Sequence, residues 1–320
     1  MNPNNTLYIV VPCYKEQEVL PETSRRLKEK VLALREQGKI SDKSRIMFVN
    51  DGSSDNTWPM IAALHEQEPD MFSGVNLSRN RGHQNALLAG LMTAVNFADM
   101  IISMDADLQD DINAVDGMVD AYHEGYEVVY GVRSKRETDT FFKRFTAEGF
   151  YKVMLALGVN IVYNHADYRL MSKRAVEGLA QFKEVNLFLR GIVPQIGYKW
   201  TTVTYERAER FAGESKYPLK KMLAFAADGI TSFSIKPIRL VLTAGVVVFM
   251  VSLIMLLYAL ISKLMGSTTA GWTSLMGSIW LIGGTQLLSL GVIGEYIRKI
   301  YNETKARPRF IIESVLNKQA

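Results

Sequence analysis

The sequence predicts an α/β domain with a mostly parallel sheet, followed by interfacial helices and two transmembrane helices. In the first half of the chain, short apolar segments alternate with helix-like segments, which is typical of parallel strands covered on both faces. Nearer the C-terminus, Leu240–Ile261 and Leu264–Gly294 contain no charged residue. Each stretch exceeds the roughly 20 helical residues needed to cross a hydrocarbon core of about 30 Å.

The expected elements follow one another in a regular order. Strands are expected at Leu7–Val11, Ile46–Val49, Gly74–Leu77, Met100–Met104 and Glu127–Gly131. Helices are expected from Glu16 to about Gln37, from the "SSDNT" cap through His65, and at Asn85–Phe97. Gly38 supplies a stop signal for the first of these helices.

Polar loops follow four of the expected strands. They are Pro12–Glu16, Asn50–Asp55, Ser78–Asn85 and Asp105–Gln109. In open α/β sheets, ligands bind outside the carboxyl ends of the strands. The sequence therefore predicts a ligand site at this edge of the sheet, and His83 is a possible contact there.

The stretch Met104–Asp111, "MDADLQDD", gathers carboxylates directly after an apolar strand. Like charges repel, so the cluster indicates a positive partner. Residues two apart share a face of an extended chain, which would align Asp105, Asp107 and Gln109. Their oxygens suit Mg²⁺ or Mn²⁺ carrying a diphosphate. A solvated acidic turn is the alternative, but the matching polar loops favour the metal.

Several other classes of site are excluded. The chain has no G-x-G-x-x-G after a strand and no G-x-x-x-x-G-K-[ST] loop. An EF-hand starting at Asp105 fails, because Asp110 replaces the glycine and Asp116 replaces the glutamate. No His/Cys spacing indicates zinc, and the single cysteine, Cys13, fits a reducing compartment. The net charge of +4 accompanies no nucleic-acid motif, so no nucleic-acid partner is expected.

Basic residues flank the two apolar stretches, and only Lys263 lies between them. The positive-inside rule then places both termini in the cytosol. The N-terminus lacks the basic region of a signal peptide. The expected parts are a cytosolic catalytic domain at 1–210, juxtamembrane amphipathic helices at 211–239, two transmembrane helices within 240–297, and a cytosolic basic tail at 298–320.

The ordered motifs resemble those of family 2 glycosyltransferases. These motifs are "VPCYKEQ", "VNDGSSDNT", "LSRNRGHQNAL", "MDADLQDD" and "GVRSKR". The later "HADYRLM" and "AGESKY", with two terminal spans, are similar to the polyprenyl-phosphate group of that family. This group contains dolichyl-phosphate mannose synthases and bacterial bactoprenol glucosyltransferases. The resemblance covers essentially the whole chain and implies a nucleotide-sugar-binding domain of the GT-A type.

The resemblance also implies roles for individual residues. Nucleotide-sugar contacts would be Pro12, Tyr14, Glu16, Asp51, Asn80, Gly82 and Asp105, with Asn50 replacing the first of two acids common in the family. The metal would be held by Asp105, Asp107 and Gln109, and catalysis would involve Asp107, Asp167 and Arg169. The acceptor phosphate would meet Arg133 and Arg144, and a closing loop would contain Arg207, Arg210 and Lys216. Asp167 would mainly position groups, with general base as the alternative.

The implied activity is an inverting transfer of a hexose, glucose from UDP-glucose, to undecaprenyl or another polyprenyl phosphate. It would occur at the cytosolic face of a bacterial inner membrane and serve cell-envelope glycosylation. UDP-N-acetylglucosamine and GDP-mannose are alternative donors. A homo-oligomer is expected from the glycines of the second apolar stretch, and the resemblance favours a tetramer.

Two other functions compete with this activity. One is a processive polysaccharide synthase, whose Q-x-x-R-W motif is only approximated by "QIGYKW" at Gln195–Trp200. The other is a non-catalytic membrane scaffold that senses nucleotide-sugars. The intact set of acidic and arginine residues argues against the scaffold.

Overall fold

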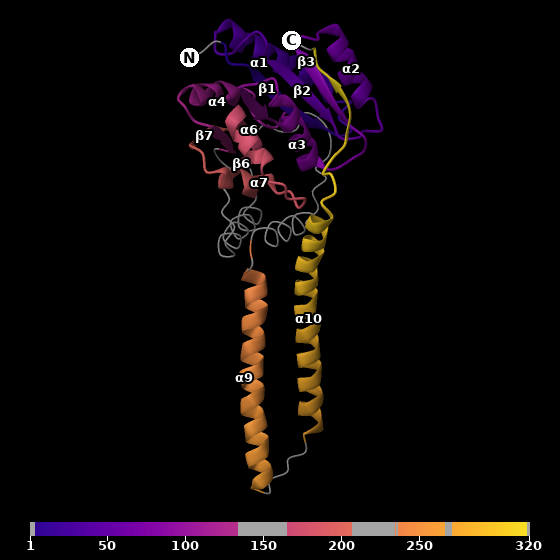
Figure 1. The fold of residues 1–320 in the computed structure, drawn as a ribbon, viewed down its shortest axis with the longest axis vertical. Helices are drawn as coiled ribbons and strands as arrows, with labels where there is room; N and C mark the ends of the chain where they lie inside the picture. Colours follow the sequence, from indigo (N-terminus) through magenta and orange to yellow (C-terminus); the bar gives the residue numbers. More distant parts are fainter. Residues whose placement is uncertain (1–3, 134–164, 207–233, 235, 266–270, 319–320) are drawn as a thin grey trace. The chain divides into compact units, whose positions relative to one another are not determined.

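The computed structural model describes residues 4–133, 165–206, 234, 236–265 and 271–318 (Figure 1). The chain forms two compact units. The first contains the described residues up to 206 together with the segment from Arg307 onward, and the second contains the two long helices α9 and α10. The predicted acceptor residue Arg144 and closing-loop residues Arg207, Arg210 and Lys216 lie outside the described residues.

The first unit is built on a sheet with the strand order β7-β5-β6-β4-β1-β2-β3-β8. Its strands are β1 (Leu7–Cys13), β2 (Arg45–Asn50), β3 (Phe72–Leu77), β4 (Met100–Ser103), β5 (Val128–Arg133), β6 (His165–Ser172), β7 (Trp200–Tyr205) and β8 (Ile312–Leu316). β1 pairs in parallel with both β2 and β4, and β2 pairs in parallel with β3. These parallel pairs confirm the predicted mostly parallel sheet. Every residue of β1 to β4 is buried, as expected for strands covered on both faces.

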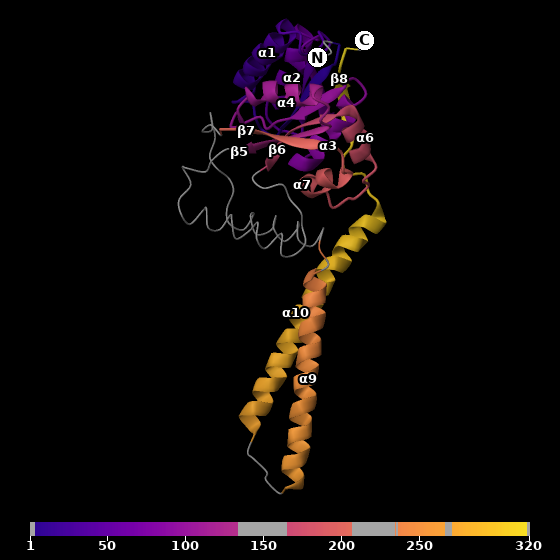
Figure 2. The same ribbon diagram turned by 90° about the vertical axis from the view of Figure 1, so that its left-hand side faces the viewer.

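Helices cover both faces of this sheet (Figure 2). They are α1 (Leu20–Glu36), α2 (Thr57–Gln67), α3 (His83–Ala94), α4 (Ala114–His123), α6 (Lys173–Ala180), α7 (Leu189–Ile192) and the 3₁₀ turn η1 (Val193–Ile196). Leu7, Ile9 and Val11 of β1 join one core cluster with residues of α1 and α4. Val10 points to the opposite face, where α3 approaches so closely at Gly90 that an added Cβ would lie 2.4 Å from Val10 Cγ1.

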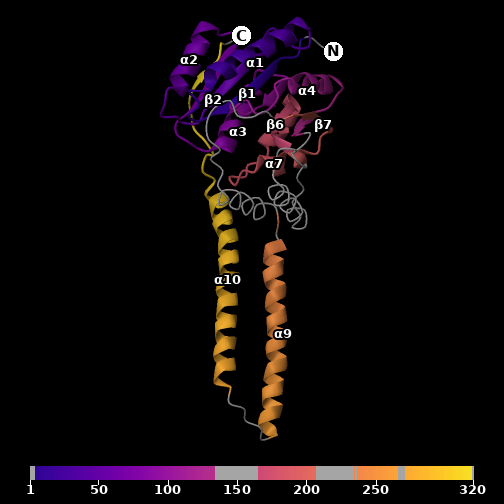
Figure 3. The same ribbon diagram turned by 180° about the vertical axis from the view of Figure 1, so that it is seen from behind.

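Two strands run against the direction of the parallel core. β6 inserts between β4 and β5 and is antiparallel to both. β8 is antiparallel to β3 at the sheet edge, although the two are separated by most of the chain (Figure 3). The sequence predicts a basic tail over 298–320, whereas α10 continues to Lys305 and the following segment returns to the first unit as β8.

The second unit contains α9 (Lys236–Leu264) and α10 (Trp272–Lys305). α9 contains the first uncharged stretch, and α10 contains most of the second. Within the part of the chain that the structure describes, no helix combines the length and the apolar character required to cross a bilayer. The two predicted transmembrane helices are therefore not confirmed. Of the predicted amphipathic segment at 211–239, nearly all residues before α9 lie outside the described ranges.

Candidate active site

The loops that follow β2 and β3 meet at the carboxyl edge of the sheet. The Asp51 N–H donates to the Cys13 carbonyl at the end of β1, over 2.9 Å. The Asp51 carboxylate accepts hydrogen bonds from the backbone N–H groups of Arg81 (2.7 Å) and Gly82 (2.9 Å). Burial raises the pKa of Asp51, although these two hydrogen bonds oppose the shift. Asp51 thus holds the Ser78–Asn85 loop in place, while Asn80 itself is exposed.

The loop after β1 joins the same edge. Lys15 has a positive φ of 57°, and its N–H donates to Ser53 Oγ over 3.1 Å. The Glu16 N–H donates to Thr57 Oγ1 over 3.0 Å. Pro12 lies within buried β1, whereas Tyr14 is 45% exposed. The loops after β1, β2 and β3, which carry Tyr14, Glu16, Asp51, Asn80 and Gly82, are therefore hydrogen-bonded to one another.

The acidic stretch after β4 is a turn, so the predicted extended conformation is wrong. β4 ends at Ser103, Leu108 has a φ of 57°, and the Gln109 N–H donates to Asp107 Oδ1 over 3.2 Å. Ala106 and Leu108 are nevertheless buried, whereas Asp105, Asp107 and Gln109 are partly exposed. The turn therefore still buries the two apolar side chains and leaves the three polar ones partly exposed, as an extended chain would.

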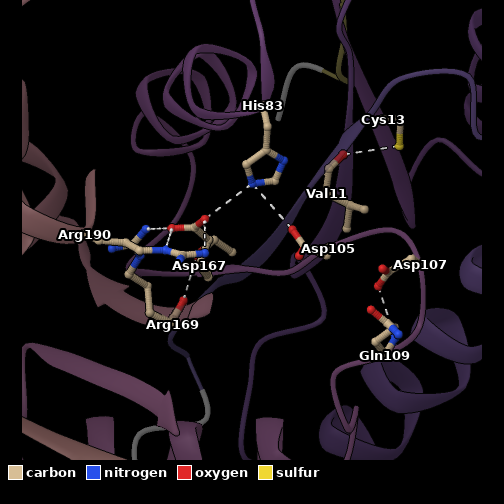
Figure 4. A network of polar contacts seen from close by, with 10 residues as sticks. Val11, Cys13, His83, Asp105, Asp107, Gln109, Asp167, Arg169 and Arg190 are labelled. Atoms are coloured by element: carbon tan, nitrogen blue, oxygen red, sulfur yellow. Dashed lines mark hydrogen bonds and ion pairs between the residues drawn. The ribbon is translucent and has the colours of Figure 1, made fainter. Parts of the chain in front are cut away.

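A buried carboxylate with two arginines forms the centre of the site (Figure 4). Arg169 Nη2 lies 2.9 Å from Asp167 Oδ1, and Arg190 Nη2 lies 3.1 Å from Asp167 Oδ2. Asp167 and Arg169 lie two apart on β6 and so share a face of the strand. Ser103 Oγ of β4 donates to the Asp167 carbonyl over 2.5 Å, which fixes this part of β6.

Charge and burial act in opposite directions on this carboxylate. Burial alone would raise the pKa of Asp167, but the positive charges of Arg190 and Arg169 hold it well below its usual range. Arg169 is fully buried, and this burial lowers its pKa although Asp167 opposes the shift. At neutral pH Asp167 is an anion fixed between two guanidinium groups.

His83, at the start of α3, links this cluster to the acidic turn. Its Nε2 lies 3.5 Å from Asp105 Oδ1 and 3.7 Å from Asp167 Oδ2. The predicted residues Asp105 and Asp167 therefore lie on either side of one imidazole, and Arg169 joins them through Asp167 (Figure 4).

Sequence reasoning missed Arg190, which lies on the short helix α7. The Leu189 N–H donates to Gln84 Oε1 over 2.8 Å, and this bond holds α7 against the start of α3. The available signal was one arginine in the otherwise apolar run "LFLRGIV".

Asp110 was also missed as a site residue. It is buried and accepts a 2.5 Å hydrogen bond from the Tyr205 hydroxyl at the end of β7. Burial, together with the negative charge of Asp105, raises the pKa of Asp110 to about 6, although the Tyr205 bond lowers it. Arg133 Nε donates to the same hydroxyl over 3.4 Å. The predicted acceptor residue Arg133 thus lies beside the acidic turn.

Within the described ranges, no group of three His, Cys, Asp or Glu side chains is arranged to hold a metal ion by itself. The predicted set of Asp105, Asp107 and Gln109 contains two carboxylates and one amide. Mg²⁺ is usually bound by one or two carboxylates together with waters and substrate phosphates. Such an ion would need the substrate to complete its ligands.

Comparisons with known proteins match nearly the whole length of the chain. Residues 8–179 match the model of the glycosyl transferase family 2, and residues 236–300 match the GtrB C-terminal hairpin. The "Uncharacterized glycosyltransferase YkoT" of Bacillus subtilis (strain 168) is 54% identical, over 96% of this chain and 91% of its own.

Relatives with a named substrate are also similar over nearly the full length. The "Prophage bactoprenol glucosyl transferase homolog" of Escherichia coli (strain K12) is 39% identical, over 96% of this chain and 98% of its own. The "Bactoprenol glucosyl transferase" of Shigella phage SfV is 38% identical, over 96% of this chain and 97% of its own.

The structure makes a prediction for Gly52, which precedes the Ser53 that binds Lys15. Gly52 and Gly38 both have positive φ angles, of 62° and 66°. A Cβ on Gly52 would lie 2.4 Å from the Arg79 carbonyl carbon, whereas one on Gly38 would meet nothing within 4 Å. Gly38→Ala should cost about 1 kcal/mol from backbone strain. Gly52→Ala should cost about 1–3 kcal/mol more because backbone must move. Equal unfolding midpoints for the two variants would contradict this.

A second prediction separates the roles of Asp167 and Asp105. Asp167→Asn leaves fully buried Arg169 without its counter-ion, so unfolding free energy at neutral pH should fall by about 3–5 kcal/mol. Asp105→Asn, at a side chain 42% exposed, should cost about 1 kcal/mol or less.

Urea titration of the purified chain, followed by tryptophan fluorescence, measures both values. Because the folded-state pKa of Asp167 is depressed, its contribution is present above the unfolded pKa of about 3.9. That contribution should disappear as the pH falls through the folded-state pKa. Similar losses of unfolding free energy in the two variants would show that the Asp167–Arg169 pair does not stabilise the fold more than an exposed ion pair does.

Proposed function

The chain belongs to glycosyl transferase family 2, and we propose that it transfers a hexose from a nucleotide-sugar to the phosphate of a polyprenyl phosphate lipid. The observation that carries this proposal is the placement of two opposite charge clusters at one sheet edge. The acidic turn with Asp105 lies on one side of His83, and the Asp167 cluster with its two arginines lies on the other. This arrangement suits a reaction between two phosphorylated substrates.

The residues of the acidic turn fit a divalent ion. Asp110, buried behind Asp105, has its pKa raised partly by that neighbour's charge, so the turn carries negative charge that a cation would neutralise. Asp105, Asp107 and Gln109 would hold Mg²⁺ or Mn²⁺ with the donor diphosphate. When bound, the ion stabilises the negative charge that develops on the leaving nucleotide.

The acceptor phosphate would meet Arg133 at the end of β5. Arginine suits this role because its guanidinium can donate two parallel hydrogen bonds to a phosphate. A phosphate monoester has a second pKa near ~6, so the attacking oxygen is mostly ionised at neutral pH. It would attack the anomeric carbon as the nucleoside diphosphate leaves, and this single displacement inverts the configuration.

Asp167 acts by positioning in this proposal, and not as a general base. Its depressed pKa makes it a weak proton acceptor at neutral pH. The acceptor phosphate is already ionised, so it has no proton that Asp167 would need to remove. Asp167 instead orients Arg190 and Arg169 beside the place of reaction.

Glucose is the proposed sugar and UDP-glucose the proposed donor, because the named relatives are bactoprenol glucosyl transferases. UDP-N-acetylglucosamine and GDP-mannose stay as alternatives. The product would be a lipid-linked sugar for glycosylation of the bacterial cell envelope.

We place the hairpin of α9 and α10 in the inner membrane, with the catalytic unit and both termini in the cytosol. Support comes from exposed apolar side chains on both helices, including Leu240, Leu257, Leu281 and Leu287. A polyprenyl chain leaves the bilayer only at about 0.8 kcal/mol per CH₂, so the enzyme must work at the interface. Within the described residues, a Cβ on Gly283, Gly284 or Gly291 would meet nothing within 4 Å. Small residues on an open helix face let a second helix approach closely, which supports a homo-oligomer, with a tetramer preferred.

The proposal predicts that the full chain in vesicles, given Mg²⁺, undecaprenyl phosphate and labelled UDP-glucose, forms a labelled lipid. Asp107→Ala should abolish this transfer, as should excess chelator. Asp111→Ser is the matched control, because a serine hydroxyl can still accept from the Asn113 N–H that Asp111 binds over 2.9 Å. Parallel assays with the two other donors identify the sugar. No lipid product from any donor, or full activity of Asp107→Ala, would refute the proposal.

Arg133→Ala tests the acceptor assignment. Loss of one charge-assisted contact, worth about 1.5–3 kcal/mol, should reduce acceptor use about ten- to hundredfold. Donor affinity, measured by calorimetry, should barely change. Arg174→Ala is the control, because this arginine is 66% exposed and pairs with Glu127, which directly precedes β5. A matching fall in donor affinity would show that Arg133 serves the nucleotide and not the acceptor.

A further inference from the structure

A chain of hydrogen bonds connects the C-terminal strand β8 to the loop after β2. Asn76 Nδ2 of β3 donates to Glu313 Oε2 of β8 over 2.8 Å. Asn50 Nδ2 of β2 donates to Asn76 Oδ1 over 2.7 Å, and the Ser53 N–H donates to Asn50 Oδ1 over 3.2 Å. Ser53 Oγ in turn accepts from the Lys15 N–H over 3.1 Å. We call these four residues, Glu313, Asn76, Asn50 and Ser53, the amide relay.

The relay has a fixed direction because a carboxylate only accepts hydrogen bonds. Glu313 therefore faces the amide nitrogen of Asn76, and this leaves the Asn76 oxygen for Asn50. Asn50 must then present its own nitrogen to Asn76 and its oxygen to the Ser53 N–H. Asn50 and Asn76 are 2% and 9% exposed, so little water is available to correct a mismatched amide.

The Ser53 loop belongs to the donor side of the site. It adjoins Asp51, whose carboxylate holds the backbone of Arg81 and Gly82, and Ser53 fixes the backbone that carries Tyr14 and Glu16. A reversed amide at Asn50 would point a nitrogen at the Ser53 N–H, and two donors repel each other. The loop would then lose the bond that sets its position.

We propose that Glu313 is a positioning residue for nucleotide binding, acting through Asn76 and Asn50 on the loop at Ser53. The C-terminal strand thereby takes part in the donor site from the far side of β3. This inference rests on the proposed function, because that function assigns the loop after β2 to the nucleotide.

The relay can be reversed by two substitutions, one at Glu313 and one at Asn50. Glu313 is exposed on β8. Glu313→Lys replaces the acceptor by a donor, and a lysine that stays against Asn76 turns Asn76 and Asn50 over, so that Ser53 meets a nitrogen. Asn50→Asp removes the amide donor, so the Asn76 oxygen faces a carboxylate either at position 50 or at Glu313. In the double variant, the lysine introduced at position 313 donates to the Asn76 oxygen, and the Asn76 nitrogen donates to the carboxylate introduced at position 50. That carboxylate also accepts from the Ser53 N–H, and every group is satisfied.

The test measures UDP affinity in the presence of Mg²⁺ by calorimetry, on the full chain in detergent. Each single variant should bind UDP about tenfold more weakly, and the double variant should return to within about twofold of the wild type. In the transfer assay, the donor KM should rise in the single variants while kcat changes little. Val315→Lys places a lysine elsewhere on the same strand, at a side chain 44% exposed and outside the relay, and should bind as the wild type does.

Hydrogen exchange gives a readout that needs no nucleotide. The amides of Ser53 and Lys15 should exchange faster in Glu313→Lys, where the Ser53 N–H meets a nitrogen. They should exchange at the wild-type rate in the double variant, where the carboxylate at position 50 accepts from that N–H. If the wild type binds no UDP, the proposed function fails, and exchange alone judges the relay. Unchanged exchange in Glu313→Lys, or a double variant that exchanges as fast as Glu313→Lys, would overturn the relay.

Discussion

The contact between Asp167 and its two arginines is the interaction on which the rest of the site depends. Arg169 is wholly buried in a strand that runs against its neighbours, and such a charge is stable only beside a partner. Asp167 supplies that partner and at the same time holds Arg190 of α7. Because α7 is also tied to Gln84 at the start of α3, one carboxylate aligns β6, α7 and α3 around His83.

The two charge clusters divide the sheet edge between them. Asp105 and the buried Asp110 make one side negative, while Arg169 and Arg190 compensate for Asp167 on the other side. In our proposal a metal-bound diphosphate lies over the first side, and Arg133, which lies beside the acidic turn, meets the anionic acceptor. In our proposal this separation brings two phosphorylated substrates together without requiring a strong base.

The sequence predicts the parallel core and the meeting of its loops well, because carboxyl ends of parallel strands share an edge whatever the details. It does not predict the turn at Asp105–Gln109, because Leu108 has a positive φ and a leucine gives no signal for that conformation. The sequence does not predict the roles of Asp110 and Arg190, because these roles depend on contacts with Tyr205 and Asp167, respectively. The strand β8 is not predicted either, because only its pairing with β3 distinguishes Ile312–Leu316 from a basic tail.

The central claim is that the donor binds at the carboxyl edge of this sheet, over the acidic turn. Photolabelling of the full chain with azido-substituted UDP-glucose and Mg²⁺, followed by peptide mapping, tests it most directly. The account predicts label in the segments 12–17, 50–55, 79–85 and 105–111, and loss of that label when unmodified UDP-glucose competes. Competed label confined to the opposite edge, where Asp99 precedes β4, Glu127 precedes β5 and Lys173 follows β6, would contradict it.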